Sequence, residues 1–358
     1  MRTLVSLGAI LIGCVRFATA GTVWIDTDVS IGSPIREVDD AYALVLAFHS
    51  SEIRIAGIST SYGNAPLGHT KRAARELVRN FGAPANLKPE QVFPGARSAA
   101  DLGRHSEASD ALAATLEKGS VTYVALGPLT NLATFLQLHP ESARKIERVI
   151  FAGGQMEGTT LAFGPRRSFH IHDANVFKDT AAAKAMVRSE IPLTLVPIAI
   201  GADLMLNEEN LRELEQQGGA GNYLARRSKV WLWFWTHFVK TSGGPIFDAL
   251  AVVAAMRPEL VSSETCYAKI DEARNLRVTR RQSAAATARR GLTSGGRVVR
   301  FCTRFAPETK RFVVRRLLAR RSREMTAPVK RGSTIDVLLS DEGQSNSRVK
   351  SIALASAI

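Results

Sequence analysis

The sequence predicts an α/β protein with a single open, Rossmann-like sheet that is largely parallel and flanked by helices. Two observations support this class. Apolar runs of strand length alternate along the chain with segments of helical spacing, which is the pattern of a parallel sheet. The polar motifs directly follow the apolar runs, at the strand ends where such sheets bind ligands. With 358 residues, of which 45% are hydrophobic, the chain is long enough to bury a large core.

The expected elements follow one another from residue 22 to residue 240. Strands are predicted at 22–27, 53–59, 121–126, 148–152 and 193–200. Helices are predicted at 41–50, at 69–81, from 132 onward, at 181–187 and over the aromatic segment 230–240. Turn motifs between them are Tyr62-Gly63-Asn64, Gly127 to Asn131, and Gly153-Gly154. We therefore assign residues 21–275 to one domain.

Residues 1–20 have the pattern of a signal peptide. Arg2 gives a positive start, an apolar stretch follows, and a small-residue pattern ends at Ala20. We expect cleavage there, and hence a secreted or periplasmic protein. Lipidation of Cys14 and an uncleaved segment are the alternatives. No later segment has the length and apolarity of a transmembrane span. Cleavage leaves Cys266 and Cys302, and the sequence leaves open whether they pair.

Residues 276–358 are a basic C-terminal extension. Residues 267–358 hold 21 Lys and Arg against 7 Asp and Glu, which accounts for the whole net charge of +14. Whether this extension completes the domain stays open, and we expect its end to be partly disordered. A basic helix is predicted at 304–323, and the linker-like composition of 282–296 precedes it. Basic runs bind polyanions, but no aromatic residues alternate with these arginines, so we do not expect nucleic acid as a partner.

An unusual aromatic run, WLWFWTHF, occupies residues 231–238. At helical spacing Trp231, Phe234, Trp235 and Phe238 share one face. Core packing explains such a face, and so does a surface that holds a planar ligand. Three indoles in five residues are more than one helix face easily buries.

Four aspartates crowd the junction between the first strand and the first helix, at Asp26, Asp28, Asp39 and Asp40. Like charges so close together repel, so a cation is expected to balance them. A hard cation such as calcium takes six to eight oxygen ligands. The spacing does not fit an EF-hand loop, so a distant acid is needed, and Asp248 again opens an apolar helix. We expect Asp26 to have a structural role.

The order of these motifs resembles the inosine-uridine preferring nucleoside hydrolase family, from Val23 to about Leu260. Each motif alone is weak, but their order and spacing together are specific. The motifs that carry the resemblance are Asp26-Thr27-Asp28, Asp39-Asp40, Tyr62-Gly63-Asn64, Gly127 to Asn131, Gly153-Gly154, Asp173-Ala174-Asn175 with Asp179, and Asp248.

The resemblance implies calcium-dependent hydrolysis of the N-glycosidic bond of a ribonucleoside. By position, the side chains of Asp28, Asp40 and Asp248 and the backbone carbonyl of Leu126 would bind Ca²⁺. Asp28 would also accept a proton from the attacking water. Carboxylates suit this chemistry, because cleavage builds positive charge on the sugar ring.

The same resemblance implies the contacts to the sugar. Asp39 and Asn64 would hold the ribose 2′- and 3′-hydroxyls, and Asp173 and Asn175 would contact the 5′-hydroxyl side. Asn64 and Asn175 count with Asp28 as catalytic residues. Trp235 is the candidate for stacking on the base.

Three departures from the family pattern concern the same site. Ten residues, 29–38, separate the two aspartate pairs, where about three are common. Phe247 replaces a histidine that protonates the leaving base in relatives, and Asp173 replaces a longer glutamate. Another acid would then have to serve, or a tryptophan would have to stack on a purine. The candidate acids are His170, His172 and His237.

The leading hypothesis is a nucleoside hydrolase for salvage, acting on a small ribonucleoside and expected to form a homo-oligomer. One alternative is a calcium-dependent nucleoside- or ribose-binding protein that has lost turnover, as Phe247 and Asp173 allow. The other is a protein anchored to polyanions through its basic C-terminal region. The preferred base stays open.

Overall fold

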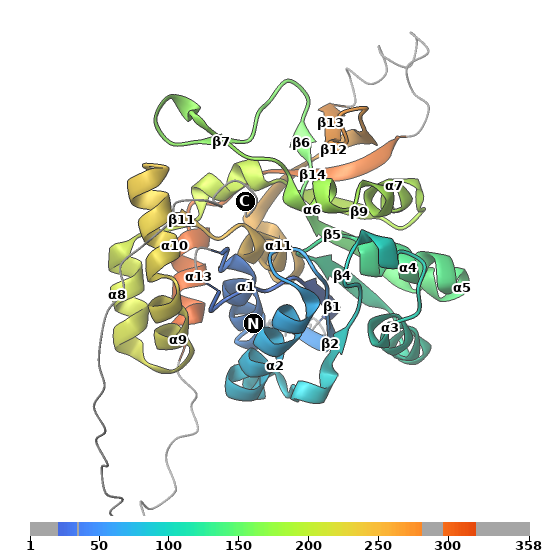
Figure 1. Ribbon diagram of the computed structural model, residues 1–358, viewed down its shortest axis with the longest axis horizontal. Coiled ribbons are helices and arrows are strands. Elements are labelled where there is room, and N and C mark those ends of the chain that lie inside the picture. Colours follow the sequence, from blue (N-terminus) through green and yellow to red (C-terminus); the bar gives the residue numbers. More distant parts are fainter. Residues whose placement is uncertain (1–20, 34–35, 281–295, 320–358) are drawn as a thin grey trace, which may run out of the picture.

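The fold is an α/β sandwich built on a ten-stranded sheet, seen in a computed structural model that describes residues 21–33, 36–280 and 296–319 (Figure 1). The strand order is β3-β2-β1-β4-β5-β9-β14-β12-β13-β6. All neighbouring strands from β3 to β14 are parallel, and β12 runs antiparallel to both β14 and β13. This confirms the predicted fold class, including the largely parallel sheet.

The strands of this sheet are, in chain order, β1 (Gly21–Thr27), β2 (Ile53–Thr60), β3 (Val92–Pro94), β4 (Val121–Ala125), β5 (Ile146–Ala152), β6 (Gln155–Met156), β9 (Leu193–Val196), β12 (Val261–Ile270), β13 (Leu276–Arg280) and β14 (Arg297–Phe305). Two short antiparallel ribbons lie outside it, formed by β7 (Ala162–Phe163) with β8 (Phe169–His170), and by β10 (Met205–Leu206) with β11 (Gly244–Pro245).

Helices cover both faces of the sheet. They are α1 (Asp39–Phe48), α2 (Leu67–Phe81), α3 (Glu107–Lys118), α4 (Thr130–Leu138), α5 (Pro140–Ala143), α6 (Ala174–Lys178), α7 (Thr180–Arg188), α8 (Glu208–Gln217), α9 (Gly219–Arg227), α10 (Lys229–Trp233), α11 (Phe247–Met256) and α13 (Thr309–Leu317). Short 3₁₀ segments, such as η5 (Ile198–Asp203), connect some of them.

Side chains along each strand alternate between the two faces of the sheet, and a separate hydrophobic core lies on each face. In β1, Val23 and Ile25 face the core beneath α1 and α11, whereas Trp24 faces the core beneath α3, α4 and α7. Neighbouring strands repeat this pattern, because successive side chains of a strand point to opposite sheet faces. Every residue of α1 is buried, so this helix and its partner α11 form the centre of one layer.

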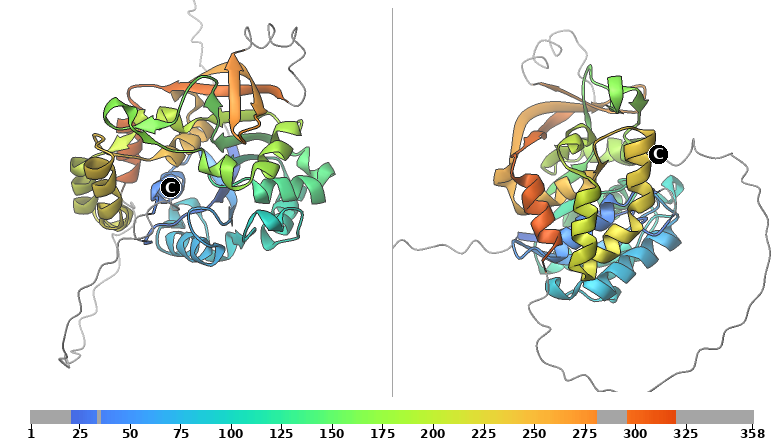
Figure 2. Two further views of the ribbon diagram at one scale, coloured as in Figure 1. Left: turned by 45° about the horizontal axis from the view of Figure 1, so that its top comes forward. Right: turned by 90° about the vertical axis from the view of Figure 1, so that its left-hand side faces the viewer.

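The C-terminal strands complete the sheet. β14 lies between β9 and β12, so a strand from beyond residue 275 sits inside the sheet. β12 and β13 extend at one edge of the molecule, as both views of Figure 2 show. α13 packs against α1, and Arg316 of α13 forms a two-pronged ion pair with Glu52, at 2.7 and 2.8 Å.

Three predicted elements differ in extent. The strand expected at 193–200 ends at Val196, because Pro197 has no N–H for the ladder and η5 begins directly afterwards. The basic helix expected at 304–323 is α13, which begins only at Thr309 after Pro307. The aromatic helix expected at 230–240 is not a uniform α-helix. It continues from α10 as the π-helix η6 (Phe234–Phe238), which turns Phe238 out to solvent, where it is 56% exposed.

Some expectations fall outside the described residues. These are the signal peptide at 1–20 with Cys14, most of the linker-like stretch 282–296, and the end of the chain from residue 320. Cys266 and Cys302, on neighbouring strands, are buried free thiols. In the part of the chain that the structure describes, no helix has both the length and the apolar character needed to cross a bilayer.

Candidate active site

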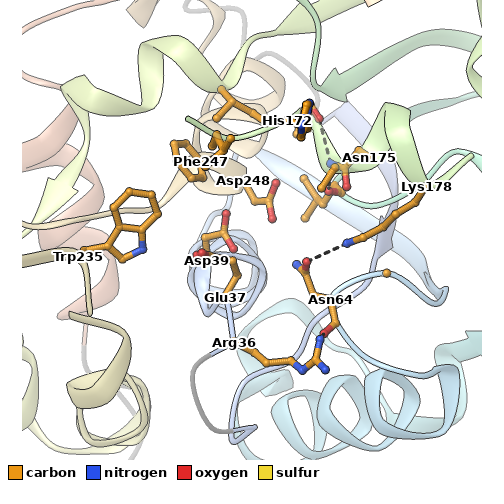
Figure 3. Close-up of a pocket in the computed structure, with 16 residues that line it drawn as sticks. Arg36, Glu37, Asp39, Asn64, His172, Asn175, Lys178, Trp235, Phe247 and Asp248 are labelled. Atoms are coloured by element: carbon orange, nitrogen blue, oxygen red, sulfur yellow. Dashed lines mark hydrogen bonds between the residues drawn. The ribbon is translucent and has the colours of Figure 1, made fainter. Parts of the chain in front are cut away.

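Helices α1 and α11 begin side by side, and each brings acidic residues to the same point. Asp39 and Asp40 open α1, and Asp248 lies in the first turn of α11. One carboxylate oxygen from each lies within 4.8 Å of the others. We call these three residues the acidic cluster. Figure 3 shows Asp39 and Asp248 facing each other across the pocket. Helix N-termini favour negative charge, but they do not cancel three like charges.

Asp28, directly after β1, is linked to this cluster through Asn64 but is not one of the three acids whose oxygens lie within 4.8 Å. Its Oδ2 accepts hydrogen bonds from the backbone N–H of Asn64, at 2.7 Å, and lies 3.9 Å from Lys178 Nζ. The Asn64 side-chain amide lies 3.4 Å from both Asp28 Oδ1 and Asp40 Oδ2, so it donates between the two carboxylates. Thr27 donates to Asp40 through its hydroxyl. The first strand and the Tyr62-Gly63-Asn64 turn therefore lock together around Asp28.

The position of Asp28 requires a glycine in the Tyr62-Gly63-Asn64 turn. A Cβ at Gly63 would lie 1.8 Å from Asp28 Oδ2, which no side chain tolerates. Gly127, after β4, approaches the same carboxylate from the other side, where a Cβ would lie 3.0 Å from Asp28 Cγ. The close packing of the backbone against the Asp28 carboxylate therefore explains the glycines at 63 and 127.

Burying these charged carboxylates without a cation costs free energy. Burial raises the pKa of Asp40 and Asp248 well above the ordinary range, and it raises the pKa of Asp39 to about 7 with help from the charge of Asp28. The pKa of Asp28 is also raised by burial, against the opposing effect of Lys178. Oδ1 of Asp39 is buried and has no hydrogen-bond partner among the described residues. An all-oxygen donor set with an unused buried oxygen fits a hard divalent cation.

The carbonyl expected to bind this cation, that of Leu126, lines the pocket. It accepts a hydrogen bond from the side-chain amide of Asn175 at 2.7 Å, and the same amide donates to Ala152 O at 3.0 Å. A carbonyl oxygen has two lone pairs, so one remains for a further ligand. Asn175 therefore joins the ends of β4 and β5 at the pocket wall.

Asp173 has a different position from the other acids. It caps α6, accepting from Val176 N, and its Oδ2 accepts from Gly154 N at 2.7 Å. Burial raises its pKa to about 6. It is absent from the residues that line the pocket, which are Arg36, Glu37, Asp39, Gly63, Asn64, Leu126, Ala152, Ile171, His172, Ala174, Asn175, Lys178, Ile198, Trp235, Phe247 and Asp248. Asp28 and Asp40 are also absent from this lining, and Asp173 differs from them because each of its two oxygens accepts a backbone hydrogen bond.

Asp26 lies on the opposite side of β1 and does not face the pocket. Its Oδ1 accepts from Ser59 Oγ at 2.7 Å and from Asn131 Nδ2 at 2.8 Å. Asn131 also accepts from the backbone N–H of Ala96. This buried network links β1 to β2 and α4, which is the structural role expected for Asp26.

An aromatic wall faces the acidic cluster. Trp235 of η6 and Phe247 of α11 line the pocket with ring centroids 6.2 Å apart. Phe163 packs edge-on against both rings. We call Trp235 and Phe247 the aromatic pair. Of the other tryptophans in the run, Trp231 is buried and Trp233 is 56% exposed.

Three charged residues of the pocket were not predicted from the sequence. Arg36 and Glu37 come from the long loop before α1, and Lys178 ends α6. Arg36 donates to the backbone carbonyl of Asn64, and Lys178 Nζ lies 3.2 Å from Asn64 Oδ1 (Figure 3). Glu37 accepts from Trp231 Nε1 at 2.9 Å, and burial raises its pKa to about 8. The sequence did contain one signal for Lys178. It lies three residues after Asn175, and residues at that spacing share one helix face.

The candidate histidines are not equivalent. His172 lines the pocket and stacks on Phe177, with ring centroids 5.8 Å apart. His170 is exposed on β8, and His237 is exposed and stacks on Trp233 outside the pocket lining. Of the three, only His172 is in position to meet a ligand.

Fold and site together define an α/β enzyme with a carboxylate centre at the carboxyl ends of its parallel strands. The family model for inosine-uridine preferring nucleoside hydrolase matches residues 23–313. The chain belongs to that family. It is accordingly a hydrolase that acts on the N-glycosyl bonds of nucleosides.

Curated relatives agree with this assignment, and solved structures agree with the fold. The chain is 28% identical over 274 residues to uridine nucleosidase 1 of Arabidopsis thaliana, covering 69% of this chain and 77% of the relative. It is 24% identical over 256 residues to the pyrimidine-specific ribonucleoside hydrolase RihB of Shigella flexneri, covering 65% and 80%. In fold it is similar to a plant nucleoside hydrolase, with a TM-score of 0.67 and 21% identity over 83% of this chain and 98% of the other. A purine-preferring ribonucleoside hydrolase from Gardnerella vaginalis has a TM-score of 0.65 at 19% identity, covering 83% and 98%.

Proposed function

We propose that this protein cleaves ribonucleosides to a free base and ribose, using Ca²⁺ held at the acidic cluster. The convergence of Asp39, Asp40 and Asp248 within 4.8 Å at a pocket carries the proposal. Calcium is favoured over softer metals because every donor is an oxygen and no cysteine or histidine belongs to the set.

The ligands expected from the sequence are the side chains of Asp28, Asp40 and Asp248 and the carbonyl of Leu126. Geometry supports adding Asp39, whose Oδ1 has no other partner among the described residues. Bound there, the ion supplies positive charge that offsets the carboxylates and polarises oxygen ligands, including water and the ribose diol.

The polar wall would orient the sugar. Asp39 and Asn64 border the pocket beside the cluster, and Asn175 borders it from α6, so hydroxyls of a ribose entering the pocket meet acceptors on two sides. Their negative and dipolar groups also stabilise the positive charge that develops on the ring as the bond breaks. Asp173 then acts through Gly154 and α6, by positioning Asn175, rather than by touching the sugar.

Asp28 would accept the proton of the attacking water. Its Oδ2 is held by the backbone N–H of Asn64, which leaves Oδ1, with only a long contact of 3.4 Å to Asn64 Nδ2, as the basic atom. Fixing one oxygen orients the other, which is the contribution expected from a positioned general base.

The aromatic pair would bind the base. Phe247 presents a partly exposed ring to the pocket, suited to stacking on a purine or pyrimidine, whereas Trp235 lines the pocket with a fully buried side chain. Phe247 cannot donate a proton to the leaving group, and His172 is the acid best placed to replace the missing histidine. The relatives include both pyrimidine-specific and purine-preferring enzymes, so we propose no base preference.

The test is release of ribose from inosine, adenosine, uridine and cytidine by the purified protein, with Ca²⁺ and with a chelator. We expect release from at least one nucleoside, loss with the chelator, and recovery on adding Ca²⁺. Tight nucleoside binding without ribose release would instead support the alternative of a binding protein without turnover, to which Phe247 points. Full activity in the chelator would overturn the role of the metal.

Export to the periplasm or the exterior, and assembly into a homo-oligomer, are further proposals that rest on the sequence pattern and the family. Fractionation of the native host tests the first. An exported chain loses residues 1–20, so its mass should be that of a mature form beginning at Gly21. Light scattering of purified protein tests the second, with a single monomer mass as the contrary result.

A further inference from the structure

A second group of metal-binding side chains lies outside the pocket. His105, Asp110 and His139 each offer one ligand atom, and these atoms all lie within 4.8 Å of one another. His105 precedes α3, Asp110 belongs to its first turn, and His139 directly follows α4. Because the two histidines are separated by more than thirty residues, their proximity comes from helix packing and not from a local sequence motif.

The spacing of one pair in this group matches that of metal ligands. His105 Nδ1 lies 3.3 Å from Asp110 Oδ1. This is longer than the roughly 2.7–2.9 Å of a charge-assisted hydrogen bond. Two ligands of a tetrahedral ion that is about 2.0–2.1 Å from each are separated by about 3.3–3.4 Å. The pair is therefore spaced as one edge of such a tetrahedron.

His139 is held in place by the core. Its ring stacks on that of Phe135, with centroids 5.1 Å apart, and Phe135 is fully buried. The ring of His105 meets it edge-on at 6.2 Å. Nε2 of His139 is buried and has no hydrogen-bond partner among the described residues. A buried polar atom without a partner needs an explanation, and a bound ion provides one.

We propose that His105, Asp110 and His139 bind a borderline divalent transition-metal ion, with Zn²⁺ as the expected occupant. Two imidazoles and one carboxylate suit zinc and do not suit calcium. Three protein ligands leave the fourth position to water. His105 and Asp110 are 69% and 63% exposed, so the ion enters freely and binds less tightly than in a closed site.

The position of this site points to a stabilising role. α3, α4 and α5 lie together at one side of the molecule (Figure 1). Thr130, at the start of α4, contacts Asp179 close to the pocket, whereas His139 is at the far end, about 13 Å away along the helix. The ion would fasten the start of α3 to the end of α4, without contact with the reacting groups.

The test is zinc titration of the tag-free full chain after removal of bound metals. Calorimetry is done with saturating Ca²⁺, so that the acidic cluster is already loaded. We expect one Zn²⁺ per chain, a higher unfolding temperature with zinc, and at least about tenfold weaker binding in His105→Ala, Asp110→Asn and His139→Ala. His69→Ala is the matched control. The His69 ring hydrogen-bonds the hydroxyl of Ser33, and among the described residues His69 belongs to no metal-binding group, so the zinc affinity of this variant is expected to be unchanged.

Two results would overturn the site. One is zinc binding that His105→Ala and Asp110→Asn leave unchanged. The other is zinc binding that Asp248→Asn abolishes, which places the ion in the acidic cluster. Because His105 and Asp110 are exposed, their variants keep the fold even if loss of the His139–Phe135 stack destabilises His139→Ala. Hydrolase activity without zinc is expected to be equal in the wild type, His105→Ala and Asp110→Asn, so this test is independent of the proposed function.

Discussion

The two walls of the pocket are built from different kinds of structure. The acidic cluster stands on the first turns of α1 and α11, two buried helices that begin where the parallel strands end. The aromatic pair stands partly on η6, a π-helix packed against the small β7–β8 ribbon. One wall is therefore a property of the common fold, and the other depends on local features of this chain.

This difference separates chemistry from selectivity. In the proposed function, groups fixed by the strand ends and helix starts would hold the reacting sugar, so substitutions there are expected to abolish turnover. Groups fixed by the irregular segment would meet the base, so substitutions there are expected to shift preference among substrates. The predictions below test that separation in order of expected effect.

The largest effect is expected for Asp28→Asn, which keeps the shape of the side chain but removes the base. Turnover should fall by a factor of about 10³ or more, in the upper part of the range for loss of a general base. Ribose release under saturating nucleoside measures it, and circular dichroism checks the fold. Glu117→Gln, an exposed position on α3, is the control and should retain the full rate. A rate close to wild type in Asp28→Asn would remove Asp28 from the chemistry.

The next effect concerns metal binding at the acidic cluster. Asp248→Asn removes one charge from a group whose oxygens lie within 4.8 Å, so Ca²⁺ affinity should fall by about 10- to 100-fold. Calorimetric titration with Ca²⁺ measures this directly, without reference to activity. Asp173→Asn, whose carboxylate binds Gly154 and Val176, should leave the affinity unchanged. Equal losses in both variants would mean that the effect is structural.

The sequence predicted the parallel part of the fold and missed the antiparallel part. The strands β1, β4 and β5 are buried on both faces and are therefore short continuous apolar runs. β12 and β14 carry exposed and half-buried residues, with arginines in β14, and the two strands pair although more than 25 residues separate them. Neither an apolar run nor a short-range turn signal marks them, so the domain boundary was drawn inside the sheet, between β12 and β13.

The site residues were likewise predicted from the sequence only in part. The acids of the cluster were predicted because helix starts after strands have a recognisable pattern, and the glycines beside Asp28 belong to the same motifs. Glu37 and Arg36 were missed because a loop of ten residues has no periodicity that assigns its side chains to a direction. The sequence identified the aromatic residues of 231–238 but not which side of the helix each one faces. A π-helix changes the angular spacing on which that assignment depends.

On the aromatic wall, Trp235→Phe is expected to have a moderate effect. It preserves an aromatic ring at a fully buried position of the pocket lining but makes that ring smaller, which changes the shape of the lining. We expect kcat/KM to fall by about 2- to 10-fold, the range of about 0.5–1.5 kcal/mol for ring contacts, with unequal effects on purine and pyrimidine nucleosides. Steady-state kinetics with inosine and uridine measures this. Trp233→Phe, on the exposed side of the same run, should change neither substrate. Equal losses for both nucleosides would contradict a role in selectivity.

The smallest effect is expected for Lys178, a cation that lies close to Asp28. Its Nζ lies 3.9 Å from Asp28 Oδ2, near the outer limit for an ion pair, and its side chain is 25% exposed whereas that of Asp28 is 1% exposed. Lys178→Met removes a positive charge that competes with Ca²⁺ for the same carboxylates, and the Ca²⁺ affinity should therefore rise by about 2- to 5-fold. Lys178→Arg, which keeps the charge, should bind Ca²⁺ as the wild type does. Weaker binding in Lys178→Met would instead mean that Lys178 supports the cluster by holding Asn64, at 3.2 Å, between its two carboxylates.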